Sequence, residues 1–342
     1  MVFLDYASTS PIVKFSSQQY GGFHCNPNAA YAYTERKALM ECEERIKAAI
    51  GVKSGRVLYF RCATEAIDWL FGTNKWCADW SHSPYEHDAC RFGYEVEENL
   101  VTDAIDFYIH QWVNHVTGEI FDIKTIRSQL PETCKLVVDA TAGFGKAKLP
   151  SDLDKIADAL FMSGHKIGCP ELSFMWLSDT LCEWLGAAKD IRNQWGLHHG
   201  SLSVASVLAL TDAVEWACEN GDRVDGHSVR LSVQMNGMLD KARIEHHDVL
   251  EHQMFTCSIN AIRLNGINAD ALQQFLASRG IYVGVGGSAC SAAHDYRVLR
   301  AYGLTDDEAA EVIRVSFGDE TTLSDIEALV EGIKEYKERF IV

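Results

Sequence analysis

The stretch ADALFMSGHK, residues 157–166, starts as an apolar run and ends in polar residues, the last of which is Lys166. This pattern predicts a buried strand with reactive side chains at its carboxyl end. An earlier stretch, CKLVVDATA at residues 134–142, places Asp139 at the end of a second apolar run. Helical or polar stretches separate such runs, which indicates an α/β fold with a mostly parallel sheet. Ligands bind at the carboxyl ends of strands in these sheets, so both ends are candidates for a functional site.

The first part of the chain predicts a helix followed by a strand. Apolar positions recur at helical spacing over residues 31–50, and Gly51 is a suitable stop. GRVLYF, residues 55–60, then predicts a short buried strand, and Thr64 lies where the cap of the next helix is expected. Further strands are predicted in 103–113, 256–265, 281–285 and 312–318, and further helices in 201–220, 269–280, 306–311 and 323–340.

The character of the sequence changes after residue 220, where short strands and helices indicate a smaller α+β part. We expect a large domain over residues 1–225 and a small C-terminal domain over 226–342. A long helix over 201–220, ending at Gly221, is expected to join them. The N-terminal segment can also pack with the small domain in this arrangement.

Composition excludes several classes of function. The chain has 342 residues and a net charge of −17, which disfavours nonspecific binding to nucleic acid or to an anionic membrane. No apolar run approaches the roughly 18 residues of a membrane span, and Asp5 interrupts the apolar N-terminus, so no signal peptide is expected. Eleven cysteines without a CxxC pair predict neither a zinc ribbon nor a disulfide framework. A cytoplasmic, reducing compartment fits this usage, and no metal is predicted.

Three predicted strand ends carry groups that suit pyridoxal phosphate. Lys166 can form a Schiff base, Asp139 can keep a pyridine nitrogen protonated, and Thr64 lies at a helix start whose free amides favour a phosphate. Two of these features have a simpler alternative. An Asp after a strand is often a helix cap, and a His-Lys pair on a loop is often solvated surface.

The stretch GGSACSAAHDY, residues 286–296, sets Cys290 apart from the other cysteines. Glycine, serine and alanine surround it, so the backbone can bend and no bulky side chain covers the sulfur. A glycine-rich turn that holds an inert thiol is the alternative, because most free cysteines fill space.

Eight motifs of this sequence resemble, in their order along the chain, those of the pyridoxal-phosphate-dependent cysteine desulfurases. These are fold-type I enzymes of the aminotransferase class V group. The similarity extends from residue 3 to about residue 335. The motifs are FLDYASTSP, NPNAAYAYTER, CATEA, YEHDA, VDATAGFGK, SGHK, GSACSA and VIRVSFGDETT. The resemblance implies a large domain with a mostly parallel sheet and a smaller α+β C-terminal domain that carries the nucleophile loop.

The resemblance also implies catalytic roles. Lys166 looks like the lysine that bonds the cofactor and moves the substrate proton, and Asp139 resembles the partner of its ring nitrogen. His87 looks like the histidine that stacks on the cofactor ring, and Arg314 like the arginine that pairs with the substrate carboxylate. Cys290 falls at the nucleophile that takes sulfur from L-cysteine as a persulfide while alanine leaves.

The remaining implied contacts hold the cofactor or the substrate. The implied cofactor ligands include Ala63, Thr64, Ser163, His165 and Ser201, the last of which stands where the family has a threonine that reaches the partner subunit's phosphate. Two positions depart from the family pattern. His115 replaces an asparagine that bonds the cofactor's phenolic oxygen or the substrate. Two alternatives follow: a one-residue bulge restores Asn114 as the substrate contact, or His115 takes the asparagine's place as a donor to the cofactor. Ala142 stands where the family tends to have glutamine.

These observations predict a homodimeric cysteine desulfurase that delivers persulfide sulfur from Cys290 to an acceptor protein. Two alternatives stay open. One is another pyridoxal-phosphate enzyme of the same fold, such as a cysteine or selenocysteine lyase or an aminotransferase. The other is a cofactor-binding or inert scaffold, because His115 and Ala142 replace polar contacts of the family.

Overall fold

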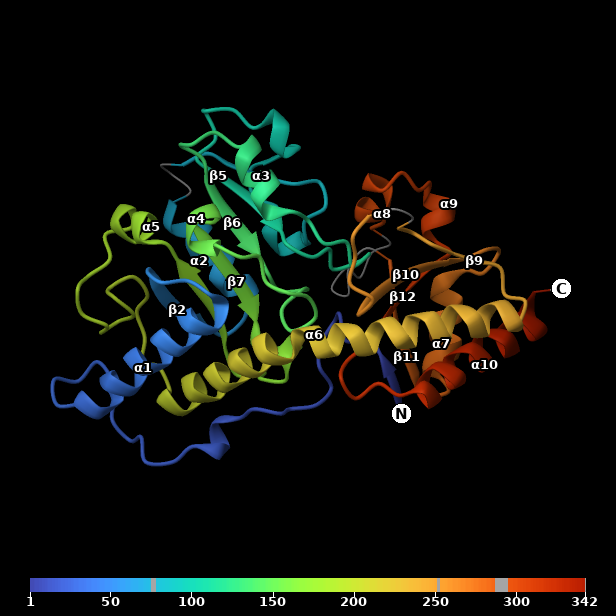
Figure 1. Ribbon diagram of the computed structural model, residues 1–342, viewed down its shortest axis with the longest axis horizontal. Helices are drawn as coiled ribbons and strands as arrows, with labels where there is room; N and C mark the ends of the chain where they lie inside the picture. Colours follow the sequence, from blue (N-terminus) through green and yellow to red (C-terminus); the bar gives the residue numbers. More distant parts are fainter. Residues whose placement is uncertain (75–77, 251–252, 287–294, 342) are drawn as a thin grey trace. The chain divides into compact units, whose positions relative to one another are not determined.

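The computed structural model describes residues 1–74, 78–250, 253–286 and 295–341 (Figure 1). Cys290 therefore lies outside the described residues. The chain divides into two compact units. The large unit comprises Ile12–Trp112 and Asp122–Asn220, and the small unit comprises Met1–Pro11, Val113–Phe121 and Gly221–Val342. The N-terminal segment and a nine-residue insert thus belong to the same unit as the C-terminal third of the chain.

The large unit is built on a sheet of seven strands within the described ranges, in the order β2-β8-β7-β6-β5-β3-β4. The strands are β2 (Arg56–Phe60), β3 (Trp80–His82), β4 (Tyr94–Glu95), β5 (Phe107–Gln111), β6 (Lys135–Asp139), β7 (Ala159–Ser163) and β8 (Ser173–Leu177). Only β8 runs antiparallel to its neighbours β2 and β7; the other pairs are parallel. The mixed α/β fold with a mostly parallel sheet is confirmed.

The register of this sheet aligns the strand ends that matter for the site. Gln111 at the end of β5 pairs with Asp139 at the end of β6. Ser173, the first residue of β8, pairs with both Phe60 and Ser163, the last residues of β2 and β7. Because β8 is antiparallel to both, β2 and β7 end at the same edge of the sheet as β5 and β6.

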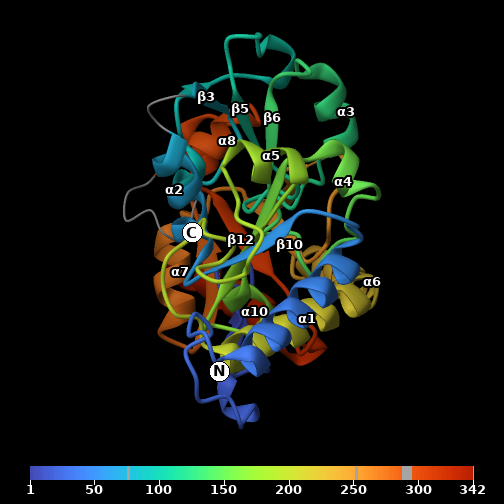
Figure 2. The same ribbon diagram turned by 90° about the vertical axis from the view of Figure 1, so that its left-hand side faces the viewer.

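Helices cover both faces of this sheet. The helices of the large unit are α1 (Tyr33–Ile50), α2 (Ala63–Asn74), α3 (Ile123–Gln129), α4 (Leu153–Ile156), α5 (Asp179–Trp184) and the first half of α6 (Val204–Lys241). Its 3-10 turns lie at Ser17–Gln19, Asp88–Cys90, Glu98–Leu100 and Gly164–Ile167. One buried cluster joins α2 and α5 to the sheet through residues such as Ile67, Leu70 and Leu181. Figures 1 and 2 show α1 beside α6, and Arg45 of α1 forms ion pairs with Asp212 and Glu215 of α6.

The small unit has its own sheet and core. Its five described strands run in the order β1-β11-β12-β10-β9, with β1 at Val2–Leu4, β9 at His246–Asp248, β10 at Ile259–Leu264, β11 at Ile281–Val285 and β12 at Val312–Ser316. Its helices are α7 (Ala269–Ala277), α8 (Arg297–Ala301), α9 (Asp306–Ala309) and α10 (Leu323–Phe340). A core of buried aliphatic residues lies between the sheet and α7, α10 and the second half of α6.

The helix α6 corrects one expectation from the sequence. It spans Val204–Lys241 without a break, so Gly221 does not end it. A glycine inside a helix costs about 1 kcal/mol relative to alanine. Burial of an apolar side chain contributes about 1.5–3 kcal/mol, and Leu231, Met235 and Leu239 are all buried beyond the glycine. The packed face therefore outweighs the helix-breaking residue.

The start of α2 corrects a second expectation. Thr64 is the second residue of α2 and not its cap. Cys62 takes the cap position, because its Sγ accepts the backbone N–H of Glu65 at 3.4 Å. The Glu65 carboxylate in turn accepts the backbone N–H of Arg61 at 2.7 Å. Sulfur thus replaces the usual oxygen of a capping residue.

None of the helices in the described ranges is long and apolar enough to cross a bilayer.

Candidate active site

The candidate site of the large unit lies at the carboxyl edge of its sheet. Asp139 ends β6, and Ser163 ends the neighbouring strand β7. Lys166 follows in the 3-10 turn Gly164–Ile167, which leads away from the end of β7. Since neighbouring strands are about 4.8 Å apart, the fold brings these predicted residues to one short stretch of the edge.

The carboxylate of Asp139 is buried and held on both oxygens. Asp139 as a whole residue is 7% exposed. Oδ1 accepts the backbone N–H of Thr141 at 2.8 Å, and Oδ2 accepts the S–H of Cys90 at 3.7 Å. The Asp139 side chain therefore keeps one orientation at the end of β6.

A second buried carboxylate, Glu86, lies close to Asp139. A carboxylate oxygen of Glu86, the Sγ atom of Cys90 and a carboxylate oxygen of Asp139 all lie within 4.8 Å of one another. Oε1 of Glu86 accepts from Ser83 Oγ at 2.9 Å and from the backbone N–H of Gln111 at 2.6 Å. Neither Glu86 nor Cys90 was predicted as a site residue, although both stand in YEHDAC, directly around the predicted His87.

Next to Lys166, His165 is shielded from protonation. Burial lowers the pKa of His165 to about 4, and the positive charges of Lys166 and Lys146 contribute further. His165 is therefore neutral at physiological pH and can donate a hydrogen bond without adding charge. Lys146, which is 5% exposed, is a buried residue of this region that the sequence did not single out.

The N-terminus of α2 offers unused donors near the end of β2. The first N–H groups of a helix have no partner within it. Among the described residues, none accepts a hydrogen bond from the backbone of Ala63 or Thr64. Ser163 and Ser173 face each other with their hydroxyls 3.4 Å apart, at the register position that also includes Phe60.

His87 is held in a defined tautomer. It caps the 3-10 turn Asp88–Cys90, and its Nδ1 accepts the backbone N–H of Ala89 at 3.1 Å. Because a backbone N–H can only donate, the neutral imidazole carries its proton on Nε2. Ser201 lies three residues before α6 and is exposed, so its hydroxyl is accessible in this chain.

The small unit holds Arg314 in a buried network. Arg314 is 3% exposed, and its Nη2 donates to Oδ1 of Asp5 at 2.8 Å. Nη1 donates to the backbone carbonyl of His115 at 2.9 Å. A Cβ added to Gly284 would lie 2.9 Å from Nε of Arg314, so this glycine makes room for the guanidinium.

Asn114 and His115 lie in the insert that belongs to the small unit. The Oδ1 atom of Asn114 accepts the backbone N–H groups of Val116 and Thr117 at 2.8 and 2.9 Å, which fixes the turn. Nδ2 of Asn114 is buried without a partner among the described residues. His115 is 5% exposed, and Ala142, in the large unit, is 4% exposed. The methyl group of Ala142 offers no hydrogen bond where the family tends to have glutamine.

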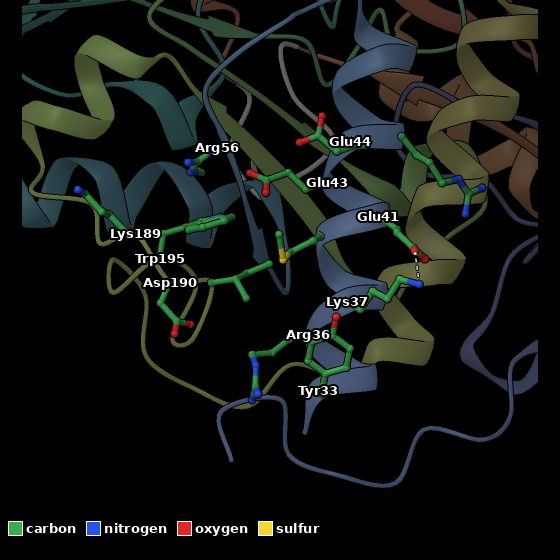
Figure 3. Close-up of a pocket in the computed structure, with 13 residues that line it drawn as sticks. Tyr33, Arg36, Lys37, Glu41, Glu43, Glu44, Arg56, Lys189, Asp190 and Trp195 are labelled. Carbon is green, nitrogen blue, oxygen red and sulfur yellow. Dashed lines mark ion pairs between the residues drawn. The ribbon is translucent and has the colours of Figure 1, made fainter. Parts of the chain in front are cut away.

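A cavity of about 990 Å³ lies elsewhere in the large unit, between α1, Arg56 of β2 and the segment 189–195 (Figure 3). Its lining mixes aromatic residues such as Tyr33 and Trp195 with acidic and basic side chains. The guanidinium of Arg56 lies 4.1 Å from the ring centre of Trp195. None of the predicted site residues lines this cavity, so it is separate from the candidate active site.

Several known proteins are similar to this chain in sequence or in structure. A putative cysteine desulfurase NifS from Halalkalibacterium halodurans is 24% identical over 99% of both chains. A cysteine desulfurase IscS from Mannheimia succiniciproducens is 26% identical over 97% of this chain and 92% of its own. Among solved structures, the NifS-like protein from Rickettsia africae has a TM-score of 0.81 at 18% identity, with 99% of both chains covered.

A structure titled NifS-like protein gives a TM-score of 0.83 at 19% identity, covering 98% of this chain and 99% of the other. These two structures share the fold of the chain. The model of the aminotransferase class-V family matches residues 92–329, which is more than half of the sequence. The chain therefore belongs to the aminotransferase class-V family.

Proposed function

We propose that this protein is a pyridoxal-phosphate-dependent cysteine desulfurase. The observation that carries the proposal is the shared sheet edge, where the buried carboxylate of Asp139 and the turn with Lys166 end neighbouring strands. The relatives named above as cysteine desulfurases, aligned over nearly the whole chain, support the same reaction.

The residues at this edge fit pyridoxal phosphate. Asp139, held by Thr141 and Cys90, offers a fixed carboxylate to the cofactor's ring nitrogen. The available N–H groups of Ala63 and Thr64 suit a phosphate, together with the hydroxyl of Ser163 and the neutral His165. When bound, this cofactor withdraws electrons from the bonds at the substrate's α-carbon.

The chain's own residues would bind the substrate and move its protons. Lys166 attaches the cofactor and takes the α-proton of L-cysteine on its Nζ. His87 carries its proton on Nε2, so this nitrogen can donate a hydrogen bond in the plane of the imidazole ring. Arg314 binds the carboxylate of the substrate with its planar guanidinium.

The sulfur transfer balances without any external oxidant. The thiolate of Cys290 attacks the sulfur of L-cysteine, so that an S–S bond forms while the C–S bond of the substrate breaks. The carbon that loses sulfur gains a proton and becomes the methyl group of alanine. The transferred sulfur is oxidised to the persulfide level as that carbon is reduced. An acceptor protein then takes the outer sulfur from Cys290 by thiol exchange.

We further propose a two-fold dimer in the cytoplasm. The exposed hydroxyl of Ser201 supports the dimer, because it stands where the family has a threonine that reaches the partner subunit's phosphate. Closed two-fold dimers are the commonest assembly of soluble enzymes. The nine cysteines in the described ranges are all free, which fits a reducing compartment. Sedimentation velocity of the loaded protein tests the dimer, and a monomer would contradict it.

The reaction is tested by incubating the loaded protein with L-cysteine and measuring alanine and sulfide with and without a thiol reductant. Alanine formation that requires Cys290 supports a desulfurase. A Cys290→Ala variant that still releases sulfide at the wild-type rate would identify a lyase. Failure of the purified chain to bind pyridoxal phosphate would indicate a scaffold.

A further inference from the structure

The orientation of the Asp139 carboxylate depends on two donors of different kinds. The backbone at this position is fixed, because the carbonyl of Asp139 accepts the N–H of Trp112 at 2.9 Å and the N–H of Ala140 donates to Phe161 at 2.9 Å. A fixed backbone does not by itself set the side-chain torsions, so the orientation of the carboxylate depends on the contacts of its oxygens. The N–H of Thr141 holds Oδ1, and the thiol of Cys90 holds Oδ2.

The thiol of Cys90 is suited to act as a lasting donor. Cys90 is 1% exposed and belongs to the core cluster of the large unit. Burial raises the pKa of Cys90 well above its usual value, and the nearby carboxylates of Asp139 and Glu86 add to the effect. The sulfur therefore keeps its proton throughout the physiological pH range and can only donate to the carboxylate.

We propose that Cys90 is a positioning residue whose S–H, by donating to Oδ2 of Asp139, fixes the orientation in which this carboxylate meets the ring nitrogen of the cofactor. This role rests on the proposed cofactor. With Oδ1 and Oδ2 each engaged once, both oxygens keep a lone pair for the ring nitrogen, because a carboxylate oxygen accepts two bonds.

The contact itself can be tested in the protein without cofactor. The difference infrared spectrum between the wild-type chain and Cys90→Ala isolates the S–H stretching band of Cys90. Asp139→Asn replaces a charged acceptor with a neutral one, so the band should move to higher frequency as the hydrogen bond weakens. A band that stays in place in Asp139→Asn would show that Cys90 does not donate to this carboxylate.

The consequence for the cofactor is tested by binding and by nuclear magnetic resonance. In Cys90→Ala we expect the dissociation constant of pyridoxal phosphate to rise roughly fivefold, the effect of about one lost hydrogen bond. With nitrogen-15 in the pyridine ring, the nitrogen chemical shift should report a smaller protonated fraction. Cys90→Ser, which keeps a donor, should restore both values.

A matched control separates positioning from packing. Cys182 is 6% exposed in the same core cluster, and its S–H donates to the backbone carbonyl of Leu177 at 3.8 Å. Cys182→Ala should lower the unfolding midpoint without changing cofactor affinity or the nitrogen shift. Equal cofactor binding by Cys90→Ala and Cys182→Ala would overturn the proposal. A wild-type chain that binds no cofactor would contradict the proposed function, while the infrared band still decides the contact.

Discussion

Substitution of Gly284 by alanine tests how tightly the small unit holds Arg314. The new Cβ would lie 2.9 Å from Nε and 3.0 Å from Nη2 of Arg314, and 3.0 Å from Oδ1 of Asp5. Ordinary contacts of a Cβ atom begin near 3.4 Å. The guanidinium must therefore shift by a few tenths of an ångström against its two hydrogen bonds.

The expected cost follows from this crowding. Inserting one methyl group into a well-packed interior costs about 1–3 kcal/mol. Arg314 and Asp5 have side chains that are only 4% and 18% exposed, so little water can replace a weakened ion pair. We expect Gly284→Ala to lower the free energy of unfolding in urea by this amount and to raise the KM for L-cysteine, because Arg314 is displaced.

A second glycine of the same unit serves as the control. Gly237 lies inside α6 with no atom within 4 Å of an added Cβ. Gly237→Ala should stabilise the protein by about 0.5–1 kcal/mol through helix propensity alone. In an Asp5→Ala background, the penalty of Gly284→Ala should shrink by about 1 kcal/mol, since the two sites are coupled. Equal stability of Gly284→Ala and wild type would refute the reasoning.

Three further substitutions address the helix cap, the separate cavity and the carboxylate site. Cys62→Ser should raise the unfolding free energy by up to about 1 kcal/mol, because a hydroxyl oxygen is a better cap acceptor than sulfur; a lower urea midpoint would contradict the cap. Burial raises the pKa of Glu43 to about 7 from its usual 4.5, so the folded chain keeps a proton there that the unfolded chain releases. The free energy of unfolding should therefore fall as pH rises between about 4.5 and 7. Glu43→Gln should make the urea midpoint depend less on pH across this window. A pH dependence equal to that of the wild type would show that Glu43 is ionised throughout. Arg314→Lys should raise the KM for L-cysteine tenfold or more with a smaller loss of kcat, because an ammonium cannot form the paired contact; an unchanged KM would exclude Arg314 from carboxylate binding.

The apolar runs of the sequence predicted most of the parallel strands because these strands are buried on both faces. β6 and β7 are examples: apolar side chains fill both, and polar residues mark their ends. β8 was not predicted as a strand, although it is equally buried. The preceding IGCPEL resembles a loop, and only pairing with β2 and β7 makes the strand.

Other features depend on contacts between distant parts of the chain. The insert with Asn114 and His115 belongs to the small unit, where its backbone bonds residues far along the sequence, such as Arg314. The contact of Cys90 with Asp139 depends on the order of the sheet, because β5 pairs both with β3, which precedes Cys90, and with β6, which ends at Asp139. Local patterns carry no information about such partners, so the ends of strands could be predicted and their surroundings could not.

The central claim is that sulfur leaves L-cysteine as a persulfide on Cys290. The most direct test is intact-mass analysis of the pyridoxal-phosphate-loaded protein after brief exposure to L-cysteine, with peptide mapping and a parallel alanine assay. The account predicts a mass increase of one sulfur atom on the peptide that contains Cys290, together with alanine. Alanine or pyruvate without added sulfur on this peptide would contradict it.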